Sequence, residues 1–141
     1  FNDLYVNLHK TYFPKALQEI ILNAMKFSHR DSYITVMVNV SGMYAVISVI
    51  NEPEKDDRGI LGIPVEYEKV IFEPFYRISK FVHEQYGTLD LGLGLTMVEK
   101  IIKKHGGEIA ARNIIDHSAS RRESQVRVNV SLSIPLLKEQ P

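Results

Sequence analysis

Glu19, Asn23 and Lys26 are the residues whose types and spacing first suggest chemistry. On a helix with 3.6 residues per turn, these positions lie along one stripe. Carboxylate and amide oxygens suit a hydrated Mg²⁺ ion, and an ammonium group attracts phosphates. The stripe alone leaves two interpretations open: a cation and phosphate site, or the solvated face that polar helix stripes usually form.

A second candidate is the glycine segment Gly92-Leu93-Gly94-Leu95, which leads directly into a predicted helix. Glycine lets the backbone approach a ligand closely, and the free N–H groups at a helix start favour an anion. No Gly-Lys-Ser/Thr follows and no βαβ unit surrounds the segment, so it is neither a Walker loop nor a dinucleotide fingerprint. Phosphate binding and simple close packing both remain explanations for Gly92 and Gly94.

The hydrophobic pattern predicts the elements that must position these residues. Apolar spacing of helical period covers 14–28, with Pro14 in the first turn, and returns over 92–104, where Gly106-Gly107 ends the helix. Strands are predicted over 33–40 and 43–50, joined by Ser41-Gly42, and over 108–113 and 125–134. A short helix over 65–72 and loops over 51–64 and 114–124 complete the chain.

This order of elements predicts an α+β fold. We expect a two-layer α/β sandwich, with helices packed on one face of a mixed, largely antiparallel sheet. The 141 residues suit one domain, and we assign 1–141 to it. The chain opens on Phe1 rather than methionine, so we expect a fragment of a larger protein.

Composition and charge exclude several classes of protein. Hydrophobic residues make up 45% of the chain and charged residues 24%, a usual mix for a soluble globular domain. The 17 basic residues balance the 17 acidic ones, so no overall field favours nucleic acid or an anionic membrane. There is no cysteine, and no apolar run approaches the roughly 20 residues of a membrane helix. We therefore predict a cytoplasmic domain that contacts neither nucleic acid nor membrane, whether or not its parent protein is membrane-attached.

Three segments carry a family resemblance when they are taken in order. Residues 19–28 (EIILNAMKFS) resemble an N box, 71–77 (IFEPFYR) an F box, and 92–95 (GLGL) with 104–107 (KHGG) a G2 box and the end of its helix. From about Leu17 to Leu136 the sequence resembles the histidine kinase branch of the GHKL, or Bergerat-fold, ATPases. The resemblance implies the ATP-binding catalytic domain of a two-component sensor histidine kinase, with ATP and Mg²⁺ as cofactors.

The resemblance also implies roles for individual residues. Asn23 would coordinate Mg²⁺, Glu19 would be the catalytic residue that assists the transfer, and Lys26 would meet the phosphates. Phe27 would pack against the adenine, and Tyr76 and Arg77 would anchor a lid over 78–91. The remaining ATP-binding positions are the triphosphate-wrapping segment Gly92, Leu93, Gly94 and Leu95, and the pair Gly62 and Ile63 of the G1 box.

The G1 box departs from the family pattern of Asp-x-Gly-x-Gly. Asn51 stands where the adenine-binding Asp is expected, directly after a predicted strand, and an insertion separates it from Gly62-Ile63. An amide oxygen still accepts a hydrogen bond from the adenine amine. Asp57, within the insertion, is the alternative residue for this role, although placement after the strand favours Asn51.

The resemblance implies two partners: the dimerisation helices that carry the phosphorylated histidine, and a response regulator receiver domain. The altered G1 box, and Leu89, Asp90 and Leu91 where Gly, Ser or Thr are common, leave a second hypothesis. In that alternative the chain is a degenerate pseudokinase that binds nucleotide weakly or docks a protein. We expect His105, at a predicted helix end, to serve capping or packing, and His9 not to be the phosphoacceptor.

Overall fold

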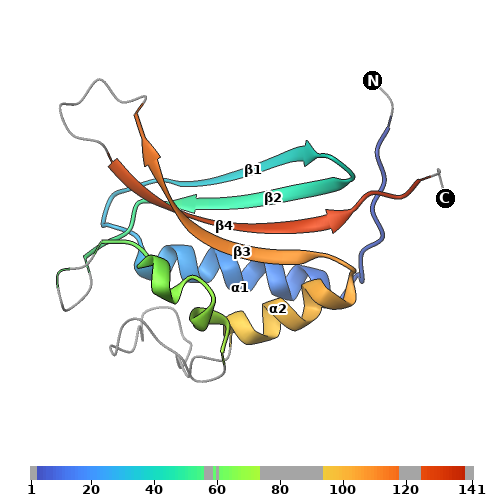
Figure 1. Ribbon diagram of the computed structural model, residues 1–141, viewed down its shortest axis with the longest axis horizontal. Coiled ribbons are helices and arrows are strands. Elements are labelled where there is room, and N and C mark those ends of the chain that lie inside the picture. The colour runs from blue at the N-terminus through green and yellow to red at the C-terminus, as the bar shows by residue number, and fades with distance from the viewer. Residues whose placement is uncertain (1–2, 56–58, 60, 74–93, 118–124, 139–141) are drawn as a thin grey trace.

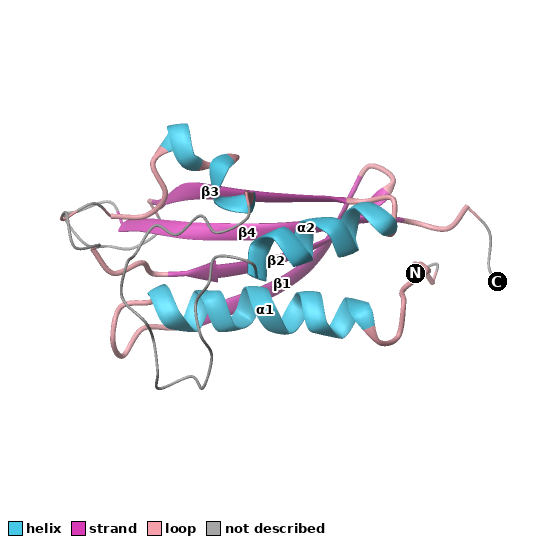
Figure 2. Cartoon of the chain, turned by 90° about the horizontal axis from the view of Figure 1, so that it is seen from below, coloured by secondary structure: helices cyan, strands magenta, loops and turns pink. Residues whose placement is uncertain are grey.

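A two-layer arrangement positions the candidate residues (Figure 1). The protein is described by a computed structural model over residues 3–55, 59, 61–73, 94–117 and 125–138. Its elements are α1 (Tyr12–Phe27), β1 (Ile34–Ser41), β2 (Tyr44–Asn51), η1 (Val65–Tyr67), η2 (Val70–Phe72), α2 (Gly94–Lys104), β3 (Glu108–Asp116) and β4 (Gln125–Pro135). Both α-helices cover the same face of the sheet (Figure 2), which confirms the predicted α/β sandwich. None of the described helices is long and apolar enough to cross a membrane.

The sheet has the strand order β1-β2-β4-β3. Each neighbouring pair among these strands is antiparallel. The first hairpin pairs Ser41 with Tyr44, so its two-residue turn is Gly42-Met43, one position later than predicted. Gly42 has a φ of 58°, a left-handed conformation that glycine adopts without the Cβ clash of other residues.

The predicted end of the third strand was wrong. β3 extends to Asp116, three residues past the predicted boundary at Asn113, so 114–116 are strand and not loop. The extension follows from pairing, because Ile114, Ile115 and Asp116 face Arg127, Val126 and Gln125 of β4. The predicted short helix over 65–72 is two separate 3-10 turns, η1 and η2.

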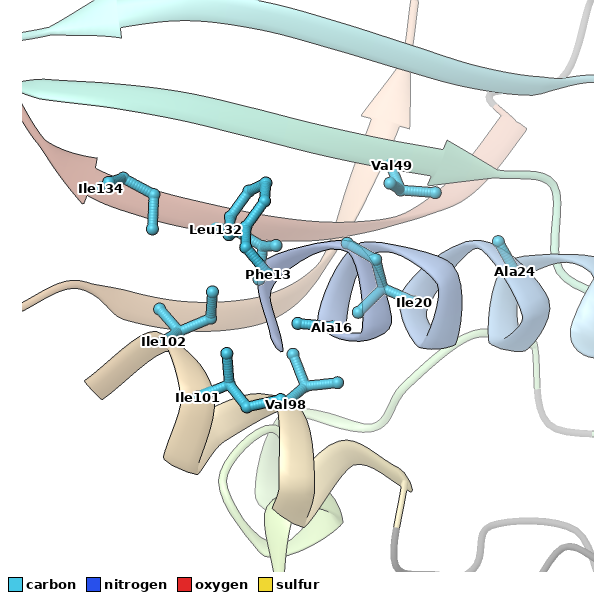
Figure 3. Close-up of a cluster of buried hydrophobic side chains, with 10 residues drawn as sticks. All are labelled: Phe13, Ala16, Ile20, Ala24, Val49, Val98, Ile101, Ile102, Leu132 and Ile134. Atoms are coloured by element: carbon cyan, nitrogen blue, oxygen red, sulfur yellow. The ribbon is translucent and has the colours of Figure 1, made fainter. Parts of the chain in front are cut away.

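The main core lies between the helices and the sheet. Figure 3 shows side chains of α1 and α2 meeting inward residues of β2 and β4. Its members are Phe13, Ala16, Ile20, Ala24, Val49, Val98, Ile101, Ile102, Leu132 and Ile134. Each large aliphatic side chain that is fully buried contributes roughly 1.5–3 kcal/mol. This packing fixes α1 and α2 against one another and against the sheet.

Two glycines end α2, as the sequence predicts. The N–H of Gly106 bonds to Lys103 O and that of Gly107 to Ile102 O, at 2.9 and 3.0 Å, the hydrogen-bond pattern of a Schellman cap. Gly106 has a φ of 74°. A Cβ on Gly107 would lie 1.9 Å from Ser133 O, so β4 packs directly on this backbone.

Histidines tie the segment before α1 to the end of α2. His9 N–H donates to Nε2 of His105 at 2.9 Å, and Nδ1 of His9 accepts from the N–H groups of Thr11 and Tyr12. The Nδ1 atom of His105 lies 2.7 Å from Ile101 O, and its ring packs edge-on against Phe13. His105 therefore has the capping and packing role that its position predicts.

Candidate nucleotide-binding site

Four parts of the chain carry the residues of the candidate site. They are the second half of α1, the end of β2, the segment with η1 and η2, and the start of α2. The two helices run in opposite directions, and the shorter α2 begins beside the middle of α1 (Figures 1 and 2). These parts hold the described members of the predicted N, G1, F and G2 boxes.

The polar stripe of α1 is not a fully solvated face. Glu19 and Asn23 are half-buried, and Lys26 is only 8% exposed. The ion pairs among the described residues include none with Lys26. A buried ammonium is stable only where anions or other acceptors compensate its lost hydration. Lys26 therefore does not lie on a solvated face, and its predicted contact with the phosphates stays a prediction.

The structure brings Glu19 directly against Gly94. A Cβ added to Gly94 would lie 1.9 Å from Oε1 and 2.6 Å from Cδ of the Glu19 side chain. Gly94 is the first residue of α2, where free N–H groups and the helix dipole favour negative charge. The N box and the G2 box thus meet at one point, and a carboxylate occupies the space that any larger residue at position 94 would fill.

The start of α2 is also joined to the F-box segment. The Thr96 hydroxyl donates a hydrogen bond to Phe72 O at 2.7 Å. Ile71 and Phe72 are buried in a second cluster with Ile63, Ala111 and Val128, and Leu95 packs against both clusters. Leu95 is therefore a packing residue at the edge of the site.

Asn51 ends β2 with its side chain buried. It is 4% exposed, and its Nδ2 atom has no hydrogen-bond partner in the described part of the chain. It pairs with Ile34 of β1 and Val128 of β4, on the same face of β2 as core residue Val49. A buried amide without a partner costs about 1–3 kcal/mol, which a ligand with an acceptor atom recovers. Purine ring nitrogens are such acceptors, so Asn51 fits a nucleotide base.

The Gly62-Ile63 pair is held by a residue that the sequence reasoning missed. The Asn113 side chain accepts from Ile63 N–H at 2.8 Å and donates to Ile63 O at 2.5 Å. One signal was available: Asn113 follows Ile109 and Ala111 at alternate, inward-facing positions of β3, where a polar side chain needs a partner.

The remaining predicted positions divide into two groups. Phe27 is half-buried at the end of α1, and its carbonyl accepts from the N–H of Glu54 at 2.9 Å. Asp57, Tyr76, Arg77, Gly92 and Leu93 lie outside the described residues, as does the predicted lid over 78–91. The choice between Asn51 and Asp57 as the adenine-binding residue therefore stays a prediction.

The fold and the convergence of these boxes define a class of ATPase. Residues 11–137 match the family described as histidine kinase-, DNA gyrase B-, and HSP90-like ATPase, and the chain belongs to this family. Within it, the chain is homologous to the ATPase domains of sensor histidine kinases. The sensor histidine kinase WalK of Bacillus subtilis (strain 168) is 31% identical over 112 residues, which are 79% of this chain and 17% of WalK.

Other relatives agree. The histidine-protein kinase ArlS of Staphylococcus haemolyticus (strain JCSC1435) is 34% identical over 106 residues, 75% of this chain and 21% of ArlS. The solved catalytic domain of histidine kinase ThkA is 26% identical with a TM-score of 0.67, over 96% of this chain and 74% of that one. The chain therefore spans only a small part of the curated kinases it matches. These names give no support to the pseudokinase alternative.

Proposed function

We propose that this chain is the catalytic domain of a sensor histidine kinase and binds Mg²⁺ and ATP to phosphorylate a histidine on separate dimerisation helices. The observation that carries the proposal is the contact of Glu19 with Gly94, which joins the N box to the start of α2. The family membership supports ATP binding, and the names of the relatives support a kinase rather than another ATPase.

Each residue of the α1 stripe has a distinct part in the proposed reaction. Glu19 orients the attacking imidazole and accepts its proton, a task suited to a carboxylate. Asn23 supplies an amide oxygen to Mg²⁺, which when bound neutralises charge on the phosphates. Lys26 places its ammonium toward the same phosphates from a largely buried position. In phosphoryl transfer the protein mainly positions groups and stabilises charge.

Asn51 is the proposed base-reading residue. Its Oδ1 atom accepts from the exocyclic amine of adenine, and its unpartnered Nδ2 group donates to a ring nitrogen. Asn and adenine form two-point contacts of this kind elsewhere in proteins. Phe27 is proposed to pack against the base from the end of α1.

The proposed partners extend beyond this chain. A solved complex of histidine kinase ThkA with the response regulator protein TrrA contains a domain like this one, with a TM-score of 0.64 and 25% identity over 96% of this chain and 31% of that one. We propose a response regulator receiver domain as the later phosphate acceptor here. The domain would act in the cytoplasm, where ATP is available.

The test is autophosphorylation of the full-length protein with γ-labelled ATP. An Asn23→Ala variant is expected to lose at least about tenfold in rate, because Mg²⁺ loses an oxygen ligand. Asn39→Ala, on exposed β1, is the matched control and should keep the unaltered rate. Undiminished phosphorylation in Asn23→Ala would contradict the proposed site.

A further inference from the structure

The side chain of Asn113, on β3, hydrogen-bonds both backbone groups of Ile63, much as a neighbouring strand would. A carboxamide presents one acceptor and one donor side by side, and both groups here engage the same residue. The Oδ1 atom lies 2.8 Å from Ile63 N, and the Nδ2 atom lies 2.5 Å from Ile63 O. The two residues are 50 positions apart in sequence. Asn113 therefore fixes the backbone of Ile63 in both directions.

Gly62 leaves the space that the Asn113 side chain needs for this contact. Its φ is 81°, and a Cβ added there would lie 2.5 Å from Oδ1 and 3.1 Å from Cγ of Asn113. The carboxamide can reach Ile63 only because position 62 has no side chain. Gly59 has the same φ of 81°, but a Cβ there would meet nothing within 4 Å. Gly59 thus shares the conformational demand of Gly62 without the contact.

In the sequence, the Gly62-Ile63 backbone lies between the proposed base-reading residue Asn51 and the F box. Ile63 is buried in the second cluster with Ile71 and Phe72, and the Thr96 hydroxyl holds Phe72 O from the start of α2. The segment from Gly62 to η2 is therefore attached at one end to β3 and at the other to α2. Movement of Ile63 would change how this segment lies beside the nucleotide.

We propose that Asn113 is a positioning residue for nucleotide binding, which acts by holding the Gly62-Ile63 backbone. This inference rests on the proposed function, since it assumes that Gly62 and Ile63 border the nucleotide. Asn113 itself need not contact the ligand. Its loss lowers nucleotide affinity in a domain that is still folded, because the main core between α1, α2 and the sheet contains neither Asn113 nor Ile63.

The experiment measures the Kd of a non-hydrolysable ATP analogue with Mg²⁺ by calorimetry, together with the melting temperature of each protein. Asn113→Ala is expected to weaken binding about tenfold, because two hydrogen bonds that hold the segment are lost. Titration well below the melting temperature separates this effect from partial unfolding. An unchanged Kd with a lowered melting temperature would reduce Asn113 to a structural residue and overturn the inference.

Two glycine variants test the mechanism independently. Gly59→Ala introduces the backbone strain alone, whereas Gly62→Ala adds the collision with Asn113, so Gly62→Ala should weaken binding several-fold more. In an Asn113→Ala background, the additional effect of Gly62→Ala should shrink toward that of Gly59→Ala, and only the 3.3 Å approach of the new Cβ to Val126 Cγ1 should remain. Equal effects of Gly62→Ala in both backgrounds would overturn the inference. Absence of nucleotide binding by the unaltered chain would instead remove the proposed function, and the inference with it.

Discussion

Two glycines at the candidate site, Gly94 and Gly62, each lie against a polar side chain, but the two side chains differ in charge and in hydrogen bonding. Gly94 leaves space for the carboxylate of Glu19, a charged group at the first turn of α2. Gly62 leaves space for the carboxamide of Asn113, a neutral group that hydrogen-bonds the next residue of the same segment. In both places an added Cβ would overlap the neighbour, and the Asn113 side chain has both of its polar atoms bonded to protein backbone, whereas no such bond links Glu19 to another described residue.

This difference is the basis on which we propose a catalytic contact at Gly94 and a supporting contact at Gly62. A side chain whose polar atoms are committed to backbone groups can hold a segment but has little left for a ligand. A carboxylate packed against a helix start keeps acceptor capacity for chemistry that takes place there. We therefore propose catalysis for the Glu19 side of the site and positioning for the Asn113 side.

The largest expected effect is on the Glu19 side. Glu19→Gln keeps the shape of the side chain but removes its capacity as a base, so histidine phosphorylation in the full-length protein should fall about a hundredfold or more. Calorimetry should show a nearly unchanged Kd for ATP. Glu99→Gln, which alters an exposed ion pair of α2, is the control. A normal rate in Glu19→Gln would remove the distinction between the two glycine contacts.

Gly94→Ala also tests the role of the Glu19 carboxylate, with a smaller expected effect on phosphorylation. The new Cβ would displace the flexible Glu19 carboxylate rather than backbone, so phosphorylation should fall about tenfold, on the order of 1.4 kcal/mol in activation free energy, with little change in melting temperature. In a Glu19→Ala background the Gly94→Ala change should add almost nothing, because residues in contact are not additive. Full additivity in the rate measurement would contradict the contact.

Asn51→Asp tests the proposed contact between Asn51 and the adenine base. The change keeps an acceptor for the adenine amine but removes the Nδ2 donor to the ring nitrogen, so binding of the ATP analogue should weaken by about 1 kcal/mol, roughly fivefold in Kd by calorimetry. The ligand-free variant should melt at a lower temperature, because position 51 is only 4% exposed and a buried carboxylate is costly. Unchanged or tighter binding of the ATP analogue would argue against the two-point contact between Asn51 and adenine.

The smallest effect is expected on the outer face of α2. Lys103 bonds Glu99 at 3.0 Å, and the Lys103 side chain is 67% exposed. Removal of such a pair by Lys103→Ala should change the free energy of unfolding by less than about 0.5 kcal/mol, and the Kd for ATP not at all. A larger change by urea titration would mean that this ion pair contributes more to the stability of the domain than an exposed pair usually does.

Local pattern predicted most of the fold. Helical spacing placed α1 and α2 to within two residues, and Gly106-Gly107 marked the end of α2 because a Schellman cap needs a left-handed residue. Strand patterns located all four strands of the described sheet. The length of β3 was missed, because it depends on β4 rather than on the residues of β3 themselves.

The site was predictable only where its contacts are local or follow a family motif. Glu19, Asn23 and Lys26 form a stripe that the helical period reveals. The burial of Lys26 and Asn51, and the bond of Asn113 to Ile63, arise from segments far apart in sequence. No local pattern encodes such distances, although a polar residue at an inward position of β3 does indicate that a partner exists.

The most direct test of the central claim is calorimetric titration of this chain with a non-hydrolysable ATP analogue, with and without Mg²⁺, beside Asn23→Ala. The account predicts binding at micromolar to submillimolar concentrations that Mg²⁺ strengthens, and an Asn23→Ala variant in which that strengthening is lost. Failure of the unaltered chain to bind the analogue, with or without Mg²⁺, would contradict the assignment of these residues to an ATP site.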